Sequence, residues 1–266
     1  MRILGRPARN CARTLAMLPQ HVLAIGRCFR VFERPAAVLW AYVTRSRPAG
    51  GFVRLRTGLT ITLSSDPADI VTVFLVFARE DYGRIEPGSA VVDIGANIGV
   101  FSLYAAACGA RFVLAYEPGA ESFDVLTRNI RQNGLEAVVT ARRLAVASGD
   151  RSIVRFPRRS SVMNTMMAGG AIGEYDEVPA TTLDAIVEPL EHVDLVKLDC
   201  EGAEYEILLT AGDPAFRKIR TIKLEYHHGR QQEIVDRLRR HGLEPTYLTA
   251  DNEIGGVIWF DRRQAA

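Results

Sequence analysis

From residue 90 onward, short apolar runs alternate with segments in which apolar residues recur at helical spacing. The runs have the length of buried strands, and the periodic segments have the length of helices. Strands and helices in alternation predict parallel strands joined by right-handed crossovers. We expect strands over residues 90–93, 111–117, 137–146, 194–199 and 221–227, and helices over residues 98–107, 121–132, 181–187, 203–210 and 230–240.

The chain ends in two more apolar strands, residues 244–248 and 256–260. Only a turn separates them, so they must pair antiparallel, because a parallel pair needs a long crossover. The pattern therefore predicts an α/β, Rossmann-like fold. Its sheet has seven strands and is mostly parallel, with an antiparallel strand near the C-terminus.

The first 88 residues follow other patterns. Residues 1–47 contain short amphipathic segments, at 11–18 and 21–32, that Pro19 and Pro35 interrupt. A β-hairpin is expected over residues 52–63, and Asp66 to Asp69 cap a helix with an apolar face. We therefore expect a basic helical segment, 1–47, followed by a main domain, 48–266, whose ligand-binding core starts at about residue 88.

Charge is distributed unevenly along the 266 residues. Residues 1–47 hold nine arginines and one acid, Glu33, although the whole chain has a net charge of only +2. This segment is either a cap on the body with solvated arginines or a surface that contacts anionic lipid or a partner protein. It lacks the interleaved aromatic residues of a nucleic-acid arm, and we expect no nucleic-acid partner.

The cysteines and the apolar runs indicate a compartment. Four scattered cysteines without paired spacing favour a reducing environment, and no apolar run is long enough to cross a membrane. Nor do the apolar residues near the N-terminus form the continuous core of a secretion signal. We expect a cytoplasmic protein, with peripheral membrane contact as the alternative for residues 1–47.

Residues 147–180 break the alternation of strand and helix. A short strand is expected at 152–156, followed by a loop at 158–173 that is rich in small and polar residues. A long loop inside an α/β body is more often a functional lid than a simple connection. Ser160, Ser161 and Asn164 are candidates to contact a substrate there.

The strand at 90–93 runs into a turn with the order D-x-G-x-N-x-G. Gly95 and Gly99 allow backbone to approach a ligand closely, and the N–H groups of Ala96 and Asn97 open the following helix. A dinucleotide site would instead show G-x-G-x-x-G. The carboxylate of Asp93 would repel a pyrophosphate but suits a sulfonium ligand such as S-adenosylmethionine.

A second acid ends the next strand. Glu117 lies 24 positions after Asp93, close to the offset of roughly 20 residues at which nucleotide folds place an acid on the ribose. Pro118 follows it, and Ala145 is expected near the adenine. Two carboxylates at successive strand ends predict a nucleotide-type cofactor site.

Charged residues also follow the fourth and fifth strands. Lys197, Asp199 and Glu201 share one phase of their strand, and Glu225 and His227 share one phase of theirs. Strands of parallel sheets are normally apolar, so these charges need an explanation. A buried ion pair, for instance Lys197 with Glu225, is the structural alternative to a catalytic role.

We expect Asp199, Glu201 and His227 to be catalytic. Asp199 or His227 would be the base that takes a proton from an acceptor hydroxyl, and Glu201 would position the acceptor or hold the turn. A metal on these three residues is an alternative without any supporting ligand spacing, so none is expected.

Four segments together resemble the FkbM-like methyltransferases. They are VDIGANIG at 92–99, YEP at 116–118, TTLD at 181–184 and VKLDCEGAE at 196–204, and the likeness covers roughly residues 50–262. The resemblance implies the class I methyltransferase fold, S-adenosylmethionine as cofactor and methylation of a hydroxyl group. The implied acceptor is a sugar, glycolipid or polyketide-type small molecule.

Three other interpretations stay open at this point. A nicotinamide-dependent enzyme would need the missing glycine pattern. A nucleobase methyltransferase usually ends the fourth strand in Asp/Asn-Pro-Pro-aromatic, whereas this chain has Asp-Cys-Glu-Gly at 199–202. The third is an inactive docking module that acts through the basic N-terminal segment, because fold alone does not imply function.

Overall fold

The computed structural model describes residues 2–3, 6–7, 18–157, 175–227, 229–249 and 255–263. The chain divides into two compact units, Met1–Gly83 and Arg84–Ala266. The predicted hairpin and its following helix therefore lie in the same unit as the basic helical segment. The domain boundary predicted after residue 47 stays a prediction.

The first unit is built from helices and two small hairpins. Its helices are α2 (Leu18–Val31), α3 (Pro35–Thr44) and α4 (Asp69–Phe74), and α4 continues as the π-helix η1 (Leu75–Arg79). Its strands pair antiparallel, β1 (Arg2–Ile3) with β2 (Arg6–Pro7) and β3 (Phe52–Arg54) with β4 (Thr60–Thr62). The hairpin over 52–63 is thus confirmed.

Two details of the first unit follow directly from residue type. Pro35 occupies the first turn of α3, where its missing N–H costs nothing. The apolar face predicted after Asp69 is buried, including Ile70, Val73 and Phe77.

The predicted helix at 11–18 lies outside the described residues except for its last position. No helix among the described residues is both long and apolar enough to cross a bilayer.

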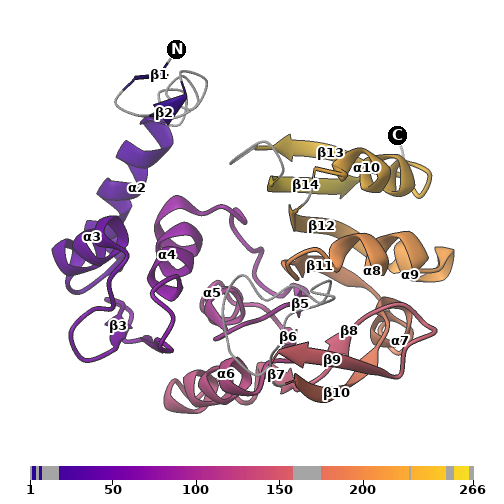
Figure 1. The fold of residues 1–266 in the computed structure, drawn as a ribbon, viewed down its shortest axis with the longest axis horizontal. Helices are drawn as coiled ribbons and strands as arrows, with labels where there is room; N and C mark the ends of the chain where they lie inside the picture. Colours follow the sequence, from indigo (N-terminus) through magenta and orange to yellow (C-terminus); the bar gives the residue numbers. More distant parts are fainter. Residues whose placement is uncertain are drawn as a thin grey trace. The chain divides into compact units, whose positions relative to one another are not determined.

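The second unit contains the seven-stranded sheet (Figure 1). Its order is β13-β14-β12-β11-β5-β6-β7, and β14 runs antiparallel to both of its neighbours. The other pairs are parallel, so the mostly parallel sheet with one antiparallel strand is confirmed. The strands are β5 (Ala90–Ile94), β6 (Phe112–Tyr116), β7 (Val139–Arg142), β11 (Val193–Leu198), β12 (Ile219–Tyr226), β13 (Leu243–Leu248) and β14 (Gly256–Arg262).

The strand order identifies the edge at which a ligand should bind. From β5 the chain moves outward to β6 and β7, and it then returns to place β11 on the other side of β5. Open α/β sheets bind ligands beyond the carboxyl ends of the strands at such a switch point. The carboxyl ends of β5, β6, β11 and β12 are therefore the expected location of a site.

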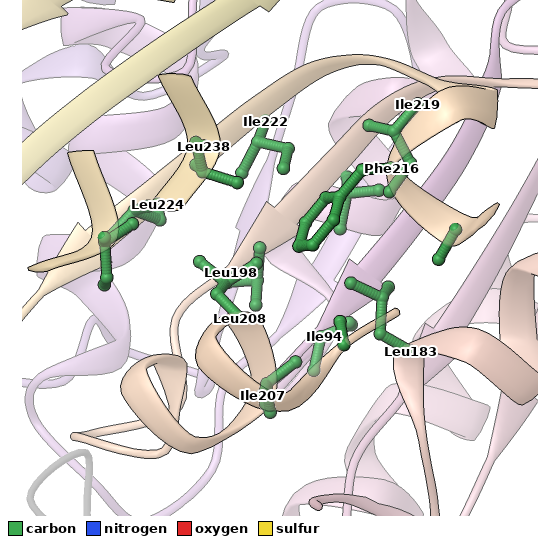
Figure 2. Close-up of a cluster of buried hydrophobic side chains, with 14 of the residues drawn as sticks. Ile94, Leu183, Leu198, Ile207, Leu208, Phe216, Ile219, Ile222, Leu224 and Leu238 are labelled. Carbon is green, nitrogen blue, oxygen red and sulfur yellow. The ribbon is translucent and has the colours of Figure 1, made fainter. Parts of the chain in front are cut away.

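Helices cover the sheet and build its core. The right-handed crossover rule puts α5 (Val100–Ala107) and α6 (Ala120–Gln132) on one face. On the other face, residues of α7 (Leu183–Val187), α8 (Glu204–Thr210), α9 (Asp213–Lys218) and α10 (Gln231–Arg239) join the strands in one buried apolar cluster. Figure 2 shows Phe216 and Leu208 packed beside Leu198 and Ile222 of the sheet.

The segment between β7 and α7 differs from its prediction. The single strand expected at 137–146 is divided into β7 and β8 (Ala145–Val146). β8 leaves the main sheet and pairs with β10 (Tyr175–Thr181), which also pairs with β9 (Ile153–Pro157). The backbone turns between them, where Leu144 N–H donates to Arg142 O at 3.0 Å. Helix α7 consequently begins at Leu183 rather than at residue 181.

The short strand expected at 152–156 is confirmed as β9, although its partner β10 and helix α9 were not predicted. The loop expected to act as a lid, 158–173, lies outside the described residues. So do Ser160, Ser161 and Asn164, the residues suggested there for substrate contact.

Candidate active site

The turn after β5 has an unusual backbone. Gly95, Asn97 and Gly99 all have positive φ, at 75°, 49° and 87°. The N–H groups of Gly95 and Ala96 both donate to Tyr116 O at 3.0 Å, which ties the turn to the end of β6. The sequence of small residues thus folds into a fixed turn at the predicted edge.

Protein contacts explain why two of these positions are glycine. A Cβ on Gly95 would lie 1.9 Å from the carbonyl oxygen of Asp199, and one on Gly99 would lie 2.5 Å from Leu126 Cδ1. The sequence analysis expected close approach of a ligand at both positions. In the structure, the backbone after β11 and a side chain of α6 approach these positions closely, and close approach of a ligand there stays a prediction.

Glu117 is held rigidly at the end of β6. Its side chain is buried, and its two oxygens accept hydrogen bonds from the N–H groups of Asn97 and Gly119, each at 2.8 Å. Burial raises the pKa of Glu117 to about 7, although both hydrogen bonds act in the opposite direction. A carboxylate fixed in this way beside the turn is suited to accept hydrogen bonds from ribose hydroxyls.

Asp93 lies deeper than the sequence analysis expected. It is fully buried, its Oδ1 lies 3.2 Å from Lys197 Nζ, and its Oδ2 accepts a hydrogen bond from Ser102 Oγ at 2.6 Å. Lys197 Nζ in turn donates to Gly95 O at 2.7 Å. Asp93 therefore supports the turn through Lys197, and direct contact between Asp93 and a cofactor stays a prediction.

Lys197 connects the turn to the end of β11. Its Nζ lies 3.2 Å from Asp93 Oδ1 and 3.9 Å from Asp199 Oδ2, whereas the sequence alone suggests Glu225 as a partner. Burial opposes the positive charge, but Asp93 and Asp199 outweigh it and raise the pKa of Lys197. The ammonium group is thus a stable charge between the two carboxylates.

The turn after β11 depends on Glu204, a residue that the sequence analysis did not single out. Glu204 is fully buried, and its carboxylate accepts hydrogen bonds from Cys200 N–H at 2.5 Å and Gly202 N–H at 2.8 Å. The residue between them, Glu201, has a left-handed backbone with φ 52°. The sequence signal for this role is the position of Glu204 in the first turn of α8, two residues after a glycine, where a carboxylate can accept hydrogen bonds from backbone N–H groups.

His227, directly after β12, meets this turn. Its Nδ1 lies 3.3 Å from Glu204 Oε1 and its Nε2 lies 3.5 Å from Glu201 Oε2. The hydroxyl of Tyr205 donates to the carbonyl oxygen of His227 and fixes the backbone there. Burial lowers the pKa of His227, but Glu204, Asp199 and Glu201 outweigh this effect and raise it to about 9.

The three predicted catalytic residues therefore come together. Atoms of Asp199, Glu201 and His227 lie within 4.8 Å of one another, and each residue is half-buried. Burial and the neighbouring carboxylate of Asp199 raise the pKa of Glu201 to about 7. Burial also raises the pKa of Asp199, although Lys197 and His227 oppose the shift.

Pro118 and Ala145 are the remaining predicted cofactor residues. Pro118 is half-buried, and its carbonyl oxygen accepts a hydrogen bond from Arg143 Nε at 3.3 Å. Ala145 is fully buried in β8 with Ala147 and Val154. Contact of either residue with a cofactor stays a prediction.

The segment that contains these residues is similar in sequence to known proteins. Residues 93–245 match the model of the methyltransferase FkbM domain. The chain is 29% identical over 218 residues to the AMB antimetabolite synthetase AmbE of Pseudomonas aeruginosa, in an alignment that covers 64% of this chain and 10% of that protein. The chain thus spans about a tenth of that relative's length.

Two further relatives are matched over most of their length. The hexuronic acid methyltransferase AglP of Haloferax volcanii is 26% identical, over 69% of this chain and 72% of AglP. The 31-O-demethyl-FK506 methyltransferase FkbM of Streptomyces tacrolimicus is 27% identical, over 65% of this chain and 81% of FkbM. The match to the family model covers more than half of the chain. It includes the turn after β5, Glu117 and the cluster of Asp199, Glu201 and His227. The chain therefore belongs to the FkbM methyltransferase family.

Proposed function

We propose that this protein transfers a methyl group from S-adenosylmethionine to a hydroxyl group of a sugar or another small hydroxylated molecule. The observation that carries the proposal is the fixed carboxylate of Glu117 beside the turn after β5. Its two oxygens would accept hydrogen bonds from ribose hydroxyls at the same carboxyl edge at which β11 ends, with β5 between β6 and β11. There, Asp199 and His227 can act on an acceptor hydroxyl.

The residues around the turn fit this cofactor. Glu117 would accept hydrogen bonds from the ribose hydroxyls, and the backbone of Gly95 to Asn97 would lie against the methionine part. The side chain of Asp93 is turned inward, but the charges of Asp93 and Lys197 keep the turn in place. When bound, the cofactor supplies a methyl group that is already activated on a sulfonium.

The chain must orient the acceptor and remove its proton. Positioning an oxygen in line with the methyl group supplies much of the rate enhancement. The hydroxyl proton must also leave as the new C–O bond forms. We assign Asp199 as the proton acceptor, because Glu204 and Glu201 on either side of His227 stabilise the protonated imidazole. His227 and Glu201 would then orient the acceptor.

The acceptor class is proposed from the relatives. AglP is a hexuronic acid methyltransferase, and FkbM is a 31-O-demethyl-FK506 methyltransferase. The name of FkbM specifies methylation of an oxygen, and a hexuronic acid is a small hydroxylated molecule. A hydroxylated acceptor fits a site with a proton acceptor and hydrogen-bonding side chains.

Calorimetric titration with S-adenosylhomocysteine, with NAD in a parallel titration, tests the cofactor. Saturable binding of S-adenosylhomocysteine alone would support the proposal, and binding of neither by folded protein would favour a docking module. Transfer of labelled methyl groups to a panel of hydroxylated sugars and lipids then tests the acceptor. In Asp199→Asn, turnover should fall about 100-fold while affinity for S-adenosylhomocysteine stays within threefold.

We further propose that the first unit binds an anionic membrane surface. Large apolar side chains are exposed on its first two described helices, including Val22 and Phe29 on α2 and Trp40 on α3, at 60%, 54% and 70% exposure. Arg30 and Arg34 are exposed near them. Apolar side chains together with basic residues are typical of helices that lie on anionic lipid.

Co-sedimentation with vesicles tests this proposal. Protein should bind vesicles that contain an anionic lipid more strongly than neutral vesicles, and Val22→Ser with Phe29→Ser should reduce that binding at least fivefold. Ile153→Ser, at a comparably exposed position in the second unit, is the matched control. Equal binding to both vesicle types, or equal loss in the control, would contradict lipid binding.

A further inference from the structure

Asp199, Glu201 and His227 form a set of ligands for a cation. Each offers one oxygen or nitrogen, and these atoms lie within 4.8 Å of one another. They come from the end of β11, the turn after it and the position directly after β12. We propose that this cluster binds a divalent cation that holds the acceptor hydroxyl, an inference that rests on the proposed methyl transfer and deepens it.

The backbone brings the two carboxylates together against their mutual repulsion. Glu204 fixes the turn through Cys200 N–H and Gly202 N–H, and Glu201 between them has a left-handed conformation. That conformation is unfavourable for a residue with a Cβ. A strained backbone that directs a carboxylate toward a second carboxylate is explained when a cation binds between them.

The imidazole is held in the orientation that a metal ligand needs. Glu204, which is fully buried, lies 3.3 Å from Nδ1, whereas Nε2 faces the cluster at 3.5 Å from Glu201 Oε2. A histidine that binds a metal through one nitrogen almost always has a carboxylate or carbonyl on the other. Tyr205 fixes the backbone of the same histidine through its carbonyl oxygen.

The local charges also favour a cation. Glu201, Glu204 and Glu225 all lie within 4.0 Å of a His227 nitrogen. Lys197 lies closer to Asp93, at 3.2 Å, than to Asp199, at 3.9 Å. Negative charge therefore exceeds positive charge around the three ligands. A divalent cation would offset this excess, and its binding would displace any proton from Nε2.

The donor set indicates which cations fit. Two carboxylate oxygens and one imidazole nitrogen suit Mn²⁺ and other divalent ions of the first-row transition metals. Three protein ligands leave coordination positions open for hydroxyl oxygens of the acceptor. A cation there would polarise the hydroxyl oxygen, and the released proton would go to the Asp199 oxygen that does not bind the cation.

Mn²⁺ is the probe for the test, because it can be followed by calorimetry and by electron paramagnetic resonance. Full-length protein with bound S-adenosylhomocysteine should bind one Mn²⁺ saturably. Glu201→Gln and His227→Gln should each weaken that binding at least tenfold. Glu244→Gln removes a carboxylate of similar exposure that pairs with Arg239 and Arg263 on the same unit, and it should stay within twofold.

A spectroscopic signal tests the imidazole ligand directly. Mn²⁺ bound to wild-type protein should show hyperfine coupling to an imidazole nitrogen, and the coupling should disappear in His227→Gln. Saturable Mn²⁺ binding without this coupling, or equal weakening in Glu244→Gln, would overturn the proposal.

Failure of this inference is distinguishable from failure of the proposed function. If S-adenosylhomocysteine binds and Mn²⁺ does not, the three residues form an ion-pair cluster with a protonated histidine, and the metal proposal is overturned alone. If S-adenosylhomocysteine does not bind to folded protein, the proposed methyl transfer itself fails.

Discussion

Glu117 combines deep burial with two fixed backbone donors, and this combination makes its charge sensitive to pH near neutrality. Its pKa is raised to about 7, mainly by burial. Below that pH the carboxyl group carries a proton, and a neutral carboxyl is a weaker acceptor for ribose hydroxyls than a carboxylate. The charged form is gained as the pH rises through about 7.

We therefore expect affinity for S-adenosylhomocysteine to rise by up to about tenfold between pH 6 and pH 8, in line with the difference between neutral and charge-assisted hydrogen bonds. Glu117→Gln should bind more weakly at pH 8 and lose most of this dependence. Calorimetric titration across the pH range measures both. If the ratio of the wild-type affinity to the Glu117→Gln affinity does not change with pH, Glu117 does not titrate in the site.

A second residue-scale prediction concerns Gly95. Alanine there would combine an unfavourable φ of 75° with a Cβ placed 1.9 Å from the carbonyl oxygen of Asp199. Gly88 is the matched control, because it has a φ of 82° and no atom within 4 Å of the added Cβ. Gly88→Ala should lower the free energy of unfolding by only about 1–2 kcal/mol.

Gly95→Ala should lose at least about 2 kcal/mol more than the control, since backbone must move to relieve the contact. Urea unfolding of the two variants measures the difference. An equal loss of unfolding free energy in both variants would mean that the ends of β5 and β11 separate easily. The close approach of Gly95 to Asp199 would then have no part in positioning Asp199.

At the scale of elements, Lys197 joins β5 and β11 at the carboxyl edge. Its partners are Asp93 on β5, Asp199 after β11 and the carbonyl oxygen of Gly95. Removing one partner of a buried ion pair leaves the other charge unpaired, which costs about 3–5 kcal/mol. Lys197→Met should therefore destabilise the second unit by about that amount.

Lys223 is the matched control, because it faces Lys197 in the register of β12 with β11 and is similarly buried. Burial lowers the pKa of Lys223 to about 8, so its charge contributes less to the folded state. Lys223→Met should lower the free energy of unfolding by less than half as much as Lys197→Met. Urea unfolding in a Trp40→Phe background, where Trp259 alone reports on the second unit, compares the two. Equal losses would show that the pair with Asp93 has no special stabilising role.

At the scale of the whole molecule, every residue assigned to the site lies in the second compact unit, Arg84–Ala266. The apolar and basic surface of α2 and α3 lies in the first unit. A protease site introduced after Gly83 should allow the intact protein to be cut between the units. Affinity for S-adenosylhomocysteine should then stay within twofold, while vesicle binding should remain with the first unit.

Loss of cofactor affinity on cutting would show that the first unit contributes to the site. Uncut protein that carries the same inserted sequence is the control for the insertion itself. Calorimetry and vesicle sedimentation on cut and uncut samples give both measurements.

The sequence by itself determined the local elements and the cofactor edge. Periodicity predicted the alternation from β5 to α10, because apolar spacing reports directly on which side of an element is buried. The turn after β5 and the acid after β6 were recognisable for a similar reason. Glycine at positive φ and a charge at a strand end are local features with few structural explanations.

Tertiary structure decided which of these residues act together. Three features are not predicted from the sequence pattern: the pairing of Lys197 with Asp93, the fixing of the turn by Glu204 and the departure of β8 from the main sheet. The first and the third depend on strands that pair in space but are distant along the chain, β5 with β11 and β8 with β10. Glu204 fixes a turn in its own segment, and only its contact with His227 depends on the distant strand β12. Crossovers and packing determine which strands are neighbours. The cluster of Asp199, Glu201 and His227 therefore forms only because β11 and β12 lie side by side.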